Sequence, residues 1–189
     1  MTEAIAKQMD NKIGLFYGST TCYTEMAAEK IRDAIVSTTE GAIEVDLFDI
    51  TDQSLALIEP FQQLILGIPT WDYGELQEDW ENIWPQLAGI NWQGKTVALY
   101  GLGDQIGYPE WFQDAMGYLW EYLVGLGAKC IGAWPNAAYT YTASKAISED
   151  GLHFVGLALD EDNEFDLSEA RIKRWCQQIL QEFESAECS

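Results

Sequence analysis

The chain has 189 residues, 48 % of them hydrophobic, which is enough to bury the core of one globular domain. Its 31 acidic and 10 basic residues give a formal net charge of −21 at pH 7, which makes nucleic acid and anionic membranes poor partners. This charge either keeps the chain soluble or suits a basic protein partner. No apolar run is long enough for a transmembrane helix.

Cysteine and histidine usage argues against a metal centre. The four cysteines lie far apart, no CxxC motif occurs, and His153 is the single histidine. A zinc or iron–sulfur site is therefore not expected. Widely spaced cysteines without a secretory signal favour a reducing cytosol, so we expect a cytoplasmic protein. Residues 1–11 are expected to form a short polar extension before a single domain that spans residues 12–189.

The predicted elements alternate between strands and helices along the chain. Residues 12–17 (KIGLFY), 43–50 (IEVDLFDI) and 64–68 (LILGI) predict strands, the last one covered on both faces. Helices are predicted at 25–36 and 78–87, a strand at 96–102, a helix at 111–126, and strands at 130–134 and 154–159. A final helix carries an apolar stripe from Ile172 to Phe183.

This alternation predicts an α/β fold, a parallel sheet with helices on both faces. In such a doubly wound sheet, ligands bind at the carboxyl ends of the strands, near the point where the strand order reverses. The loops of interest are therefore residues 18–24, 69–74 and 101–108, each of which follows a predicted strand.

The first loop favours an anion. Its backbone amides lead into a helix N-terminus, where the helix dipole also attracts negative charge. Hydroxyl side chains at Ser19, Thr20, Thr21 and Thr24 add donors that suit a phosphate monoester. Helix capping by Thr21 or Thr24 is the simpler interpretation. The lysine of a nucleotide-hydrolysing P-loop is absent, so that chemistry is not expected.

The second and third loops each carry an aromatic residue among glycines. Trp71 lies in PTWDYGE and Tyr108 lies in GLGDQIGYPEW. Either both rings pack on the core, or they sandwich a planar ligand between neighbouring loops. The second interpretation fits a ligand that has a planar ring as well as a phosphate.

These loops resemble those of the flavodoxin family. The segments GIPTWDYGELQEDW, YGLGDQIGY and FVGLALDEDN resemble the long-chain bacterial class, and FYGSTTCYTEMAAEKI resembles the bacterial second flavodoxins. The resemblance covers residues from about 12 to 183. It implies a five-stranded parallel sheet in the order 2-1-3-4-5, with an insertion at residues 136–153 that interrupts the fifth strand.

The resemblance also implies a function. A flavodoxin is an electron carrier and not an enzyme, and it binds one FMN without a covalent link. The implied partners are a basic NADPH-dependent flavodoxin or ferredoxin reductase and electron-acceptor proteins, and the chain is expected to be a monomer. Because the flavin performs the redox chemistry and the protein adjusts its potential, no catalytic residue is expected. Carboxylates near the flavin edge predict a low potential.

The residues that the resemblance assigns to FMN lie in the three loops. In the first loop they are Ser19, Thr20, Thr21, Cys22, Tyr23 and Thr24, around the phosphate. In the second loop they are Thr70, Trp71, Asp72, Tyr73 and Gly74, with Trp71 on one face of the ring. In the third loop they are Gly101, Gly103, Asp104, Gly107 and Tyr108, with Tyr108 on the other face and Asp104 at the pyrimidine edge.

Cys22 departs from the family pattern, which has glycine at this position. If the position requires a positive φ, a cysteine is strained there, and an oxidised thiol would disturb the loop. The sequence favours the other interpretation, in which this branch accommodates cysteine in an ordinary backbone conformation.

Two further functions stay open. The chain could be an FMN-dependent quinone reductase on a related fold, or a regulatory module without flavin.

Overall fold

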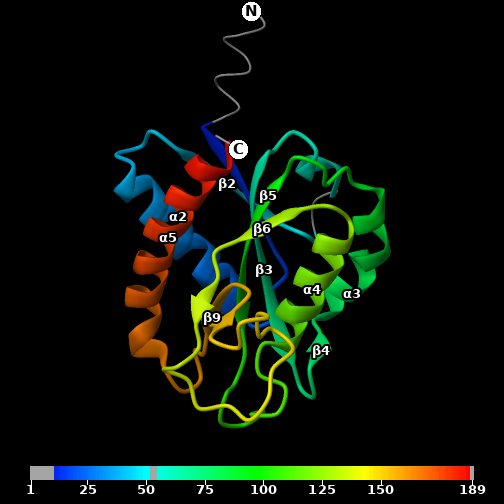
Figure 1. Ribbon diagram of the computed structural model, residues 1–189, viewed down its shortest axis with the longest axis vertical. Helices are drawn as coiled ribbons and strands as arrows, with labels where there is room; N and C mark the ends of the chain where they lie inside the picture. The colour runs from blue at the N-terminus through cyan, green and yellow to red at the C-terminus, as the bar shows by residue number, and fades with distance from the viewer. Residues whose placement is uncertain (1–10, 52–54, 188–189) are drawn as a thin grey trace, which may run out of the picture.

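A parallel β-sheet forms the centre of the molecule in the computed structural model, which describes residues 11–51 and 55–187 (Figure 1). Strands β1 (Lys12–Tyr17), β2 (Glu44–Asp49), β3 (Gln63–Trp71), β5 (Thr96–Leu102) and β6 (Lys129–Ile131) lie in the order β2-β1-β3-β5-β6. All neighbours in this order pair in parallel. The predicted flavodoxin-like order 2-1-3-4-5 is therefore confirmed. Of the extension predicted at residues 1–11, residues 1–10 lie outside the described residues.

The fifth strand of this order is built from two segments. β6 pairs with the first half of β5, and β9 (Leu157–Leu159) pairs with residues 100–102 in its second half. Residues 132–156 lie between the two segments and contain an antiparallel pair, β7 (Trp134–Pro135) and β8 (His153–Phe154). An insertion that interrupts the fifth strand is thus confirmed, although it is longer than the predicted 136–153.

Two predicted strands therefore have the wrong bounds. The prediction at 130–134 fails because Gly132 has a φ of 84°, which ends the extended conformation. The prediction at 154–159 merges β8 with β9. At Gly156, which lies between them, a Cβ would come within 2.3 Å of the Leu99 carbonyl oxygen, so the chain approaches β5 too closely for a side chain.

Helices cover both faces of the sheet, as Figure 1 shows. Helices α2 (Tyr23–Thr38) and α5 (Phe165–Glu187) lie on one face. The other face is covered by α3 (Glu78–Ile83), the 3-10 helix η2 (Trp84–Gly89) and α4 (Asp114–Gly125). β5 is buried along its whole length, because its side chains meet helices on either side.

The second helical layer departs from the sequence prediction at two points. The helix predicted at 78–87 becomes α3 followed by η2, because Pro85 interrupts the α-helical hydrogen bonds at the start of η2. The helix predicted at 111–126 begins only at Asp114, since Gln113 has a left-handed φ of 65°. Two short elements were not predicted, η1 (Leu55–Ile58) and β4 (Glu75–Leu76).

Candidate cofactor site

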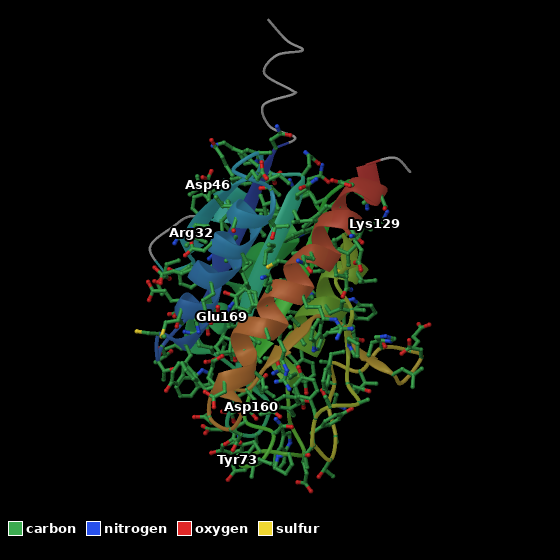
Figure 2. The ribbon with its side chains drawn as sticks, turned by 90° about the vertical axis from the view of Figure 1, so that its left-hand side faces the viewer. Arg32, Asp46, Tyr73, Lys129, Asp160 and Glu169 are labelled. Atoms are coloured by element: carbon green, nitrogen blue, oxygen red, sulfur yellow. The ribbon has the colours of Figure 1, made fainter. Side chains whose placement is uncertain are left out.

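The three predicted loops meet at one end of the molecule, where they enclose a cavity of about 250 Å³ at the carboxyl ends of β1, β3 and β5. Figure 2 shows Tyr73 and Asp160 at this end. The first and second loops contribute Thr21, Tyr23, Thr24, Thr70, Trp71 and Asp72 to the lining, and the third contributes Gly103, Asp104 and Tyr108.

The first loop presents hydrogen-bond donors that have no partner among residues 11–51 and 55–187. The Ser19 hydroxyl oxygen is buried and forms no hydrogen bond. None of the backbone amides of residues 19–22 donates a hydrogen bond to a described residue. Helix α2 begins directly afterwards, and the side chain of its N-cap residue forms no capping hydrogen bond. Unpaired amides and a hydroxyl at a helix N-terminus form a donor set for an anion such as a phosphate monoester.

The simpler capping interpretation does not hold, because neither Thr21 nor Thr24 caps helix α2. The N-cap is Cys22, with a φ of 67° in the left-handed region. The favoured prediction of an ordinary backbone at Cys22 is therefore wrong. The loop keeps the turn for which glycine is suited, so the cysteine side chain is carried in an unfavourable conformation.

The second loop holds Trp71 between β3 and a short return strand. Trp71 ends β3 and pairs with Glu75 of the antiparallel strand β4. At the tip between them, Asp72 has a φ of 40° and Gly74 a φ of 89°. Thr70 accepts a hydrogen bond from the Ala115 amide at 3.2 Å, which ties this loop to the N-terminus of α4.

The third loop is organised by Asp104. Its Oδ1 accepts hydrogen bonds from the amides of Ile106 at 3.0 Å and Gly107 at 2.6 Å. Burial alone would raise the Asp104 pKa, but bonds from the Gly107 amide, the Asn163 side chain and the Ile106 amide lower it overall. This carboxylate is therefore a fixed negative charge beside the cavity.

Tyr108 of the third loop reaches across to the second. Its hydroxyl lies 3.4 Å from the Asp72 carboxylate, and its ring meets Tyr73 edge-on at a centroid distance of 6.0 Å. The Asp72 charge raises the pKa of Tyr108, with smaller contributions from burial and the hydrogen bond itself. Trp71 and Tyr108 thus border one cavity from two loops, which is the geometry that a planar ligand between them requires.

A fourth segment at residues 160–163 was missed by the sequence analysis. Glu161 and Asp162 line the cavity, and the fully buried Asp160 accepts the Gln105 amide hydrogen at 3.1 Å. Asn163 donates to both Asp160, at 3.0 Å, and Asp104, at 2.8 Å. The signal in the sequence is the polar run DEDN, which comes directly after the strand predicted at 154–159.

The remaining lining residues that were not predicted are apolar: Pro69, Leu102, Trp111 and Phe112. Several predicted residues lie beside the cavity without lining it, namely Ser19, Thr20, Cys22, Tyr73, Gly74, Gly101 and Gly107. For two of them the structure gives a reason. A Cβ at Gly101 would lie 2.2 Å from Gln113 Oε1, and one at Gly74 would lie 2.9 Å from Asp114 Oδ2. These glycines let neighbouring segments approach.

Comparison with known proteins agrees with this architecture. The family model described as Flavodoxin matches residues 15–175. Flavodoxin 2 of Escherichia coli K12 is 58 % identical over 170 residues, which are 90 % of this chain and 95 % of that protein. A flavodoxin of Synechococcus elongatus is 46 % identical over 172 residues, covering 91 % of this chain and 98 % of its own.

Among solved structures, Fusobacterium nucleatum flavodoxin bound to flavin mononucleotide is 34 % identical, with a TM-score of 0.82. The match covers 91 % of this chain and 98 % of that one. The strand order β2-β1-β3-β5-β6, with a cavity at the carboxyl ends of the strands, is that of a flavodoxin-type fold. The chain belongs to the flavodoxin family. Within that family it is a long-chain member that is similar to flavodoxin 2.

Proposed function

We propose that this chain binds one FMN without a covalent link in the cavity of about 250 Å³ and carries electrons between proteins. It is an FMN-based electron-transfer protein and not an enzyme. The observation that carries the assignment of the site is the unpaired donor set of the first loop, next to a cavity bordered by Trp71 and Tyr108.

Each loop has a separate task in this proposal. The amides of residues 19–22 and the Ser19 hydroxyl hold the phosphate, and the N-terminus of α2 adds its dipole. Trp71 and Tyr108 flank the ring, and Asp104 meets its polar edge. When bound, FMN supplies the chemistry of accepting and releasing electrons, and the protein sets its orientation, solvent exposure and potential.

The carboxylates around the cavity favour a low reduction potential. Asp72, Asp104, Glu161 and Asp162 all line it, and no lysine or arginine of residues 11–51 and 55–187 does. A like charge about 6 Å away costs roughly 3 kcal/mol at an effective dielectric constant of about 20, and less when solvent screens it. For one electron, about 1.4 kcal/mol corresponds to about 59 mV. Negative charge gained on reduction is therefore disfavoured.

The partners in this proposal are a basic NADPH-dependent flavodoxin or ferredoxin reductase as donor, and acceptor proteins with basic surfaces. The net charge of −21 supports docking by complementary charge. We further propose that residues 12–189 act as one FMN-binding domain, as a monomer in the cytoplasm. Among the described helices, none combines the length and the apolar character needed to cross a membrane.

An absorption spectrum of the purified chain tests the cofactor. We expect a yellow protein with one FMN per chain, or a colourless one that quenches the fluorescence of added FMN. A chain that does neither would contradict the proposal and support a module without flavin.

The FMN-dependent quinone reductase is the other alternative, which the family membership does not favour. Turnover of NAD(P)H and quinone without a separate reductase would establish that enzyme instead.

Docking is tested by the rate at which a NADPH-dependent flavodoxin reductase reduces the FMN-loaded chain. This rate should fall as salt rises, because exposed charges are screened beyond about 10 Å at 0.1 M ionic strength. Glu75→Lys, on the exposed edge of the second loop, should slow it further at low salt. A rate that does not depend on ionic strength would rule out electrostatic docking.

A further inference from the structure

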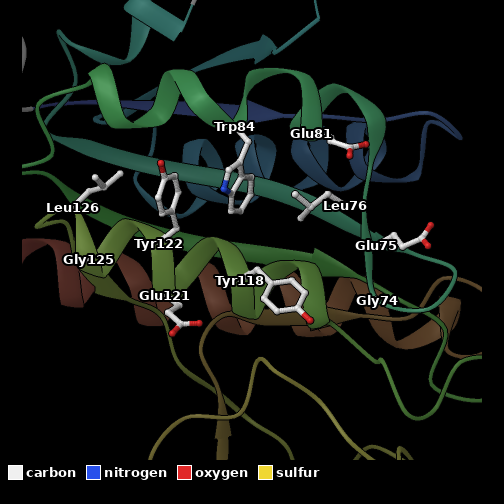
Figure 3. Close-up of a pocket in the computed structure, with 10 residues that line it drawn as sticks. All are labelled: Gly74, Glu75, Leu76, Glu81, Trp84, Tyr118, Glu121, Tyr122, Gly125 and Leu126. Carbon is white, nitrogen blue, oxygen red and sulfur yellow. The ribbon is translucent and has the colours of Figure 1, made fainter.

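A second hollow lies outside the candidate cofactor site, between α3 with η2 on one side and α4 on the other. Its volume is about 1070 Å³, and we call it the aromatic groove. Figure 3 shows that it begins at Gly74 and Glu75, on the second loop of the candidate cofactor site, and runs along α4 to Leu126. The residues that line it are Gly74, Glu75, Leu76, Glu81, Trp84, Tyr118, Glu121, Tyr122, Gly125 and Leu126.

The floor of the groove is aromatic and partly open to solvent. The rings of Trp84 and Tyr122 stack at a centroid distance of 5.3 Å and an interplanar angle of 10° (Figure 3). Tyr118, Tyr122 and Leu126 follow one another at four-residue spacing, so α4 presents a continuous apolar stripe toward the groove. Tyr118 is 39 % exposed. The outward face of a surface helix is normally polar, and an apolar stripe there is typical of an interaction surface.

The rim of the groove is negative. Glu75, Glu81 and Glu121 line it, and none of them forms an ion pair with another described residue. Glu75 and Glu81 lie at the end nearest Gly74, as Figure 3 shows. None of the lysines or arginines that the structure describes is among the lining residues. An aromatic floor with a carboxylate rim is complementary to a cation on an apolar stem, such as an arginine or lysine side chain.

A second copy of the chain is a poor occupant, because two molecules of charge −21 repel each other. We propose that the aromatic groove receives a segment of a partner protein that carries arginine or lysine next to an apolar side chain. Because the groove starts at Glu75 on the second loop, that partner docks directly beside the cofactor site. The identity of the partner as a redox protein rests on the proposed function, whereas the chemistry of the bound segment does not.

The test uses the full-length chain, isotope-labelled, and two short peptides, acetyl-LRLR-amide and acetyl-GRGR-amide. Amide chemical shifts are followed by NMR during each titration. We expect acetyl-LRLR-amide to shift the signals of α3, η2 and α4, and acetyl-GRGR-amide to bind more weakly because it cannot cover the aromatic floor. Shifts spread evenly over the acidic surface, or equal affinity for the two peptides, would overturn the proposal.

Variants locate the binding. Glu81→Gln combined with Glu121→Gln should raise the Kd of acetyl-LRLR-amide by about fivefold or more, since two rim charges are lost. Tyr118→Ala, at an exposed position, should raise it by about threefold. The matched control is Glu169→Gln with Glu184→Gln on the exposed face of α5, which should leave the Kd within about twofold. A control effect as large as the groove effect would overturn the proposal.

Sedimentation equilibrium tests whether a second copy of the chain occupies the aromatic groove. A dimer that dissociates in the Tyr118→Ala variant would make a second copy the occupant and refute our proposal, whereas a monomer supports it. None of these measurements requires flavin turnover. A chain that lacks FMN but binds acetyl-LRLR-amide in the groove would contradict the proposed function alone, and an FMN-loaded chain that does not bind it would contradict this inference alone.

Discussion

Replacing Cys22 by glycine measures the strain in the first loop. Cys22 has a φ of 67°, and its side chain is exposed and makes no capping hydrogen bond. The left-handed conformation costs a non-glycine residue about 1–2 kcal/mol. Glycine removes that cost but loses roughly 0.5–1 kcal/mol through the greater freedom of the unfolded chain. We therefore expect Cys22→Gly to raise the free energy of unfolding by about 0.5–1 kcal/mol.

Urea unfolding of the FMN-free chain, followed by circular dichroism and tryptophan fluorescence, gives this free energy. Two controls separate the causes. Cys22→Ala removes the thiol but keeps a Cβ in the left-handed region, so it should change the free energy of unfolding little. Glu40→Gly relieves a φ of 51° at an exposed turn outside the candidate site and should give a similar gain.

The affinity for FMN provides a second measurement. The strain at Cys22 is present before any ligand binds, so it cancels from the binding free energy if the loop keeps its shape. We expect the Kd for FMN to change less than about threefold, close to 0.6 kcal/mol. The reasoning is refuted if Cys22→Gly destabilises the chain while Glu40→Gly stabilises it, because the left-handed cost at Cys22 would then be absent.

Three further predictions concern the cavity and the residues that support it. Trp71→Ala and Tyr108→Ala should each weaken FMN binding by about two- to tenfold in fluorescence titrations, since each ring stack is worth about 0.5–1.5 kcal/mol; unchanged affinity in both variants would exclude the sandwich. Asp72→Gly should raise the free energy of unfolding of the FMN-free chain in urea more than Asp72→Asn does, because only glycine also removes the cost of a φ of 40°, and equal changes would indicate charge alone. Asp160→Ala should lower the free energy of unfolding by about 2–4 kcal/mol in urea, because the Gln105 amide and the Asn163 side chain lose their buried acceptor; a loss below about 0.5 kcal/mol would contradict that role.

The sheet could be predicted from the sequence because its strands are apolar runs of the right length. Segments such as 12–17 and 96–102 are buried on both faces, so their composition alone marks them. The ends of the helices and strands were harder to predict, because the backbone conformation of one residue sets each end. Gln113 and Gly132 both adopt a positive φ, and in neither case does the neighbouring pattern of apolar residues change at that point.

The site could be predicted where hydroxyl or aromatic side chains lie close together in the sequence. The hydroxyl-rich first loop and the two aromatic loops follow strands directly, so their positions in the fold follow from the strand order. The positive φ at Cys22 was not predictable from chemistry, because an exposed cysteine has no side-chain requirement for it. Here the backbone of the turn prevails over the conformational preference of the residue.

The fourth segment shows why the rest of the site needed the three-dimensional structure. Residues 160–163 read as an ordinary polar turn, and only burial reveals that Asp160 is an acceptor inside the fold. Its position depends on β9, which pairs with the second half of β5 and so ends beside the third loop.

The insertion that splits the fifth strand therefore also supports the candidate site, a role that was not predicted from the sequence. Gln105 of the third loop accepts a hydrogen bond from the Thr140 amide of the insertion through its side chain, while its own amide donates to Asp160. The Pro109 carbonyl accepts a further bond from the Thr142 amide at 2.7 Å. The loop that carries Tyr108 is thus held from the insertion on one side and from residues 160–163 on the other. Tyr108 lies between Gln105 and Pro109 in the chain, so these two supports together restrain its position beside the cavity.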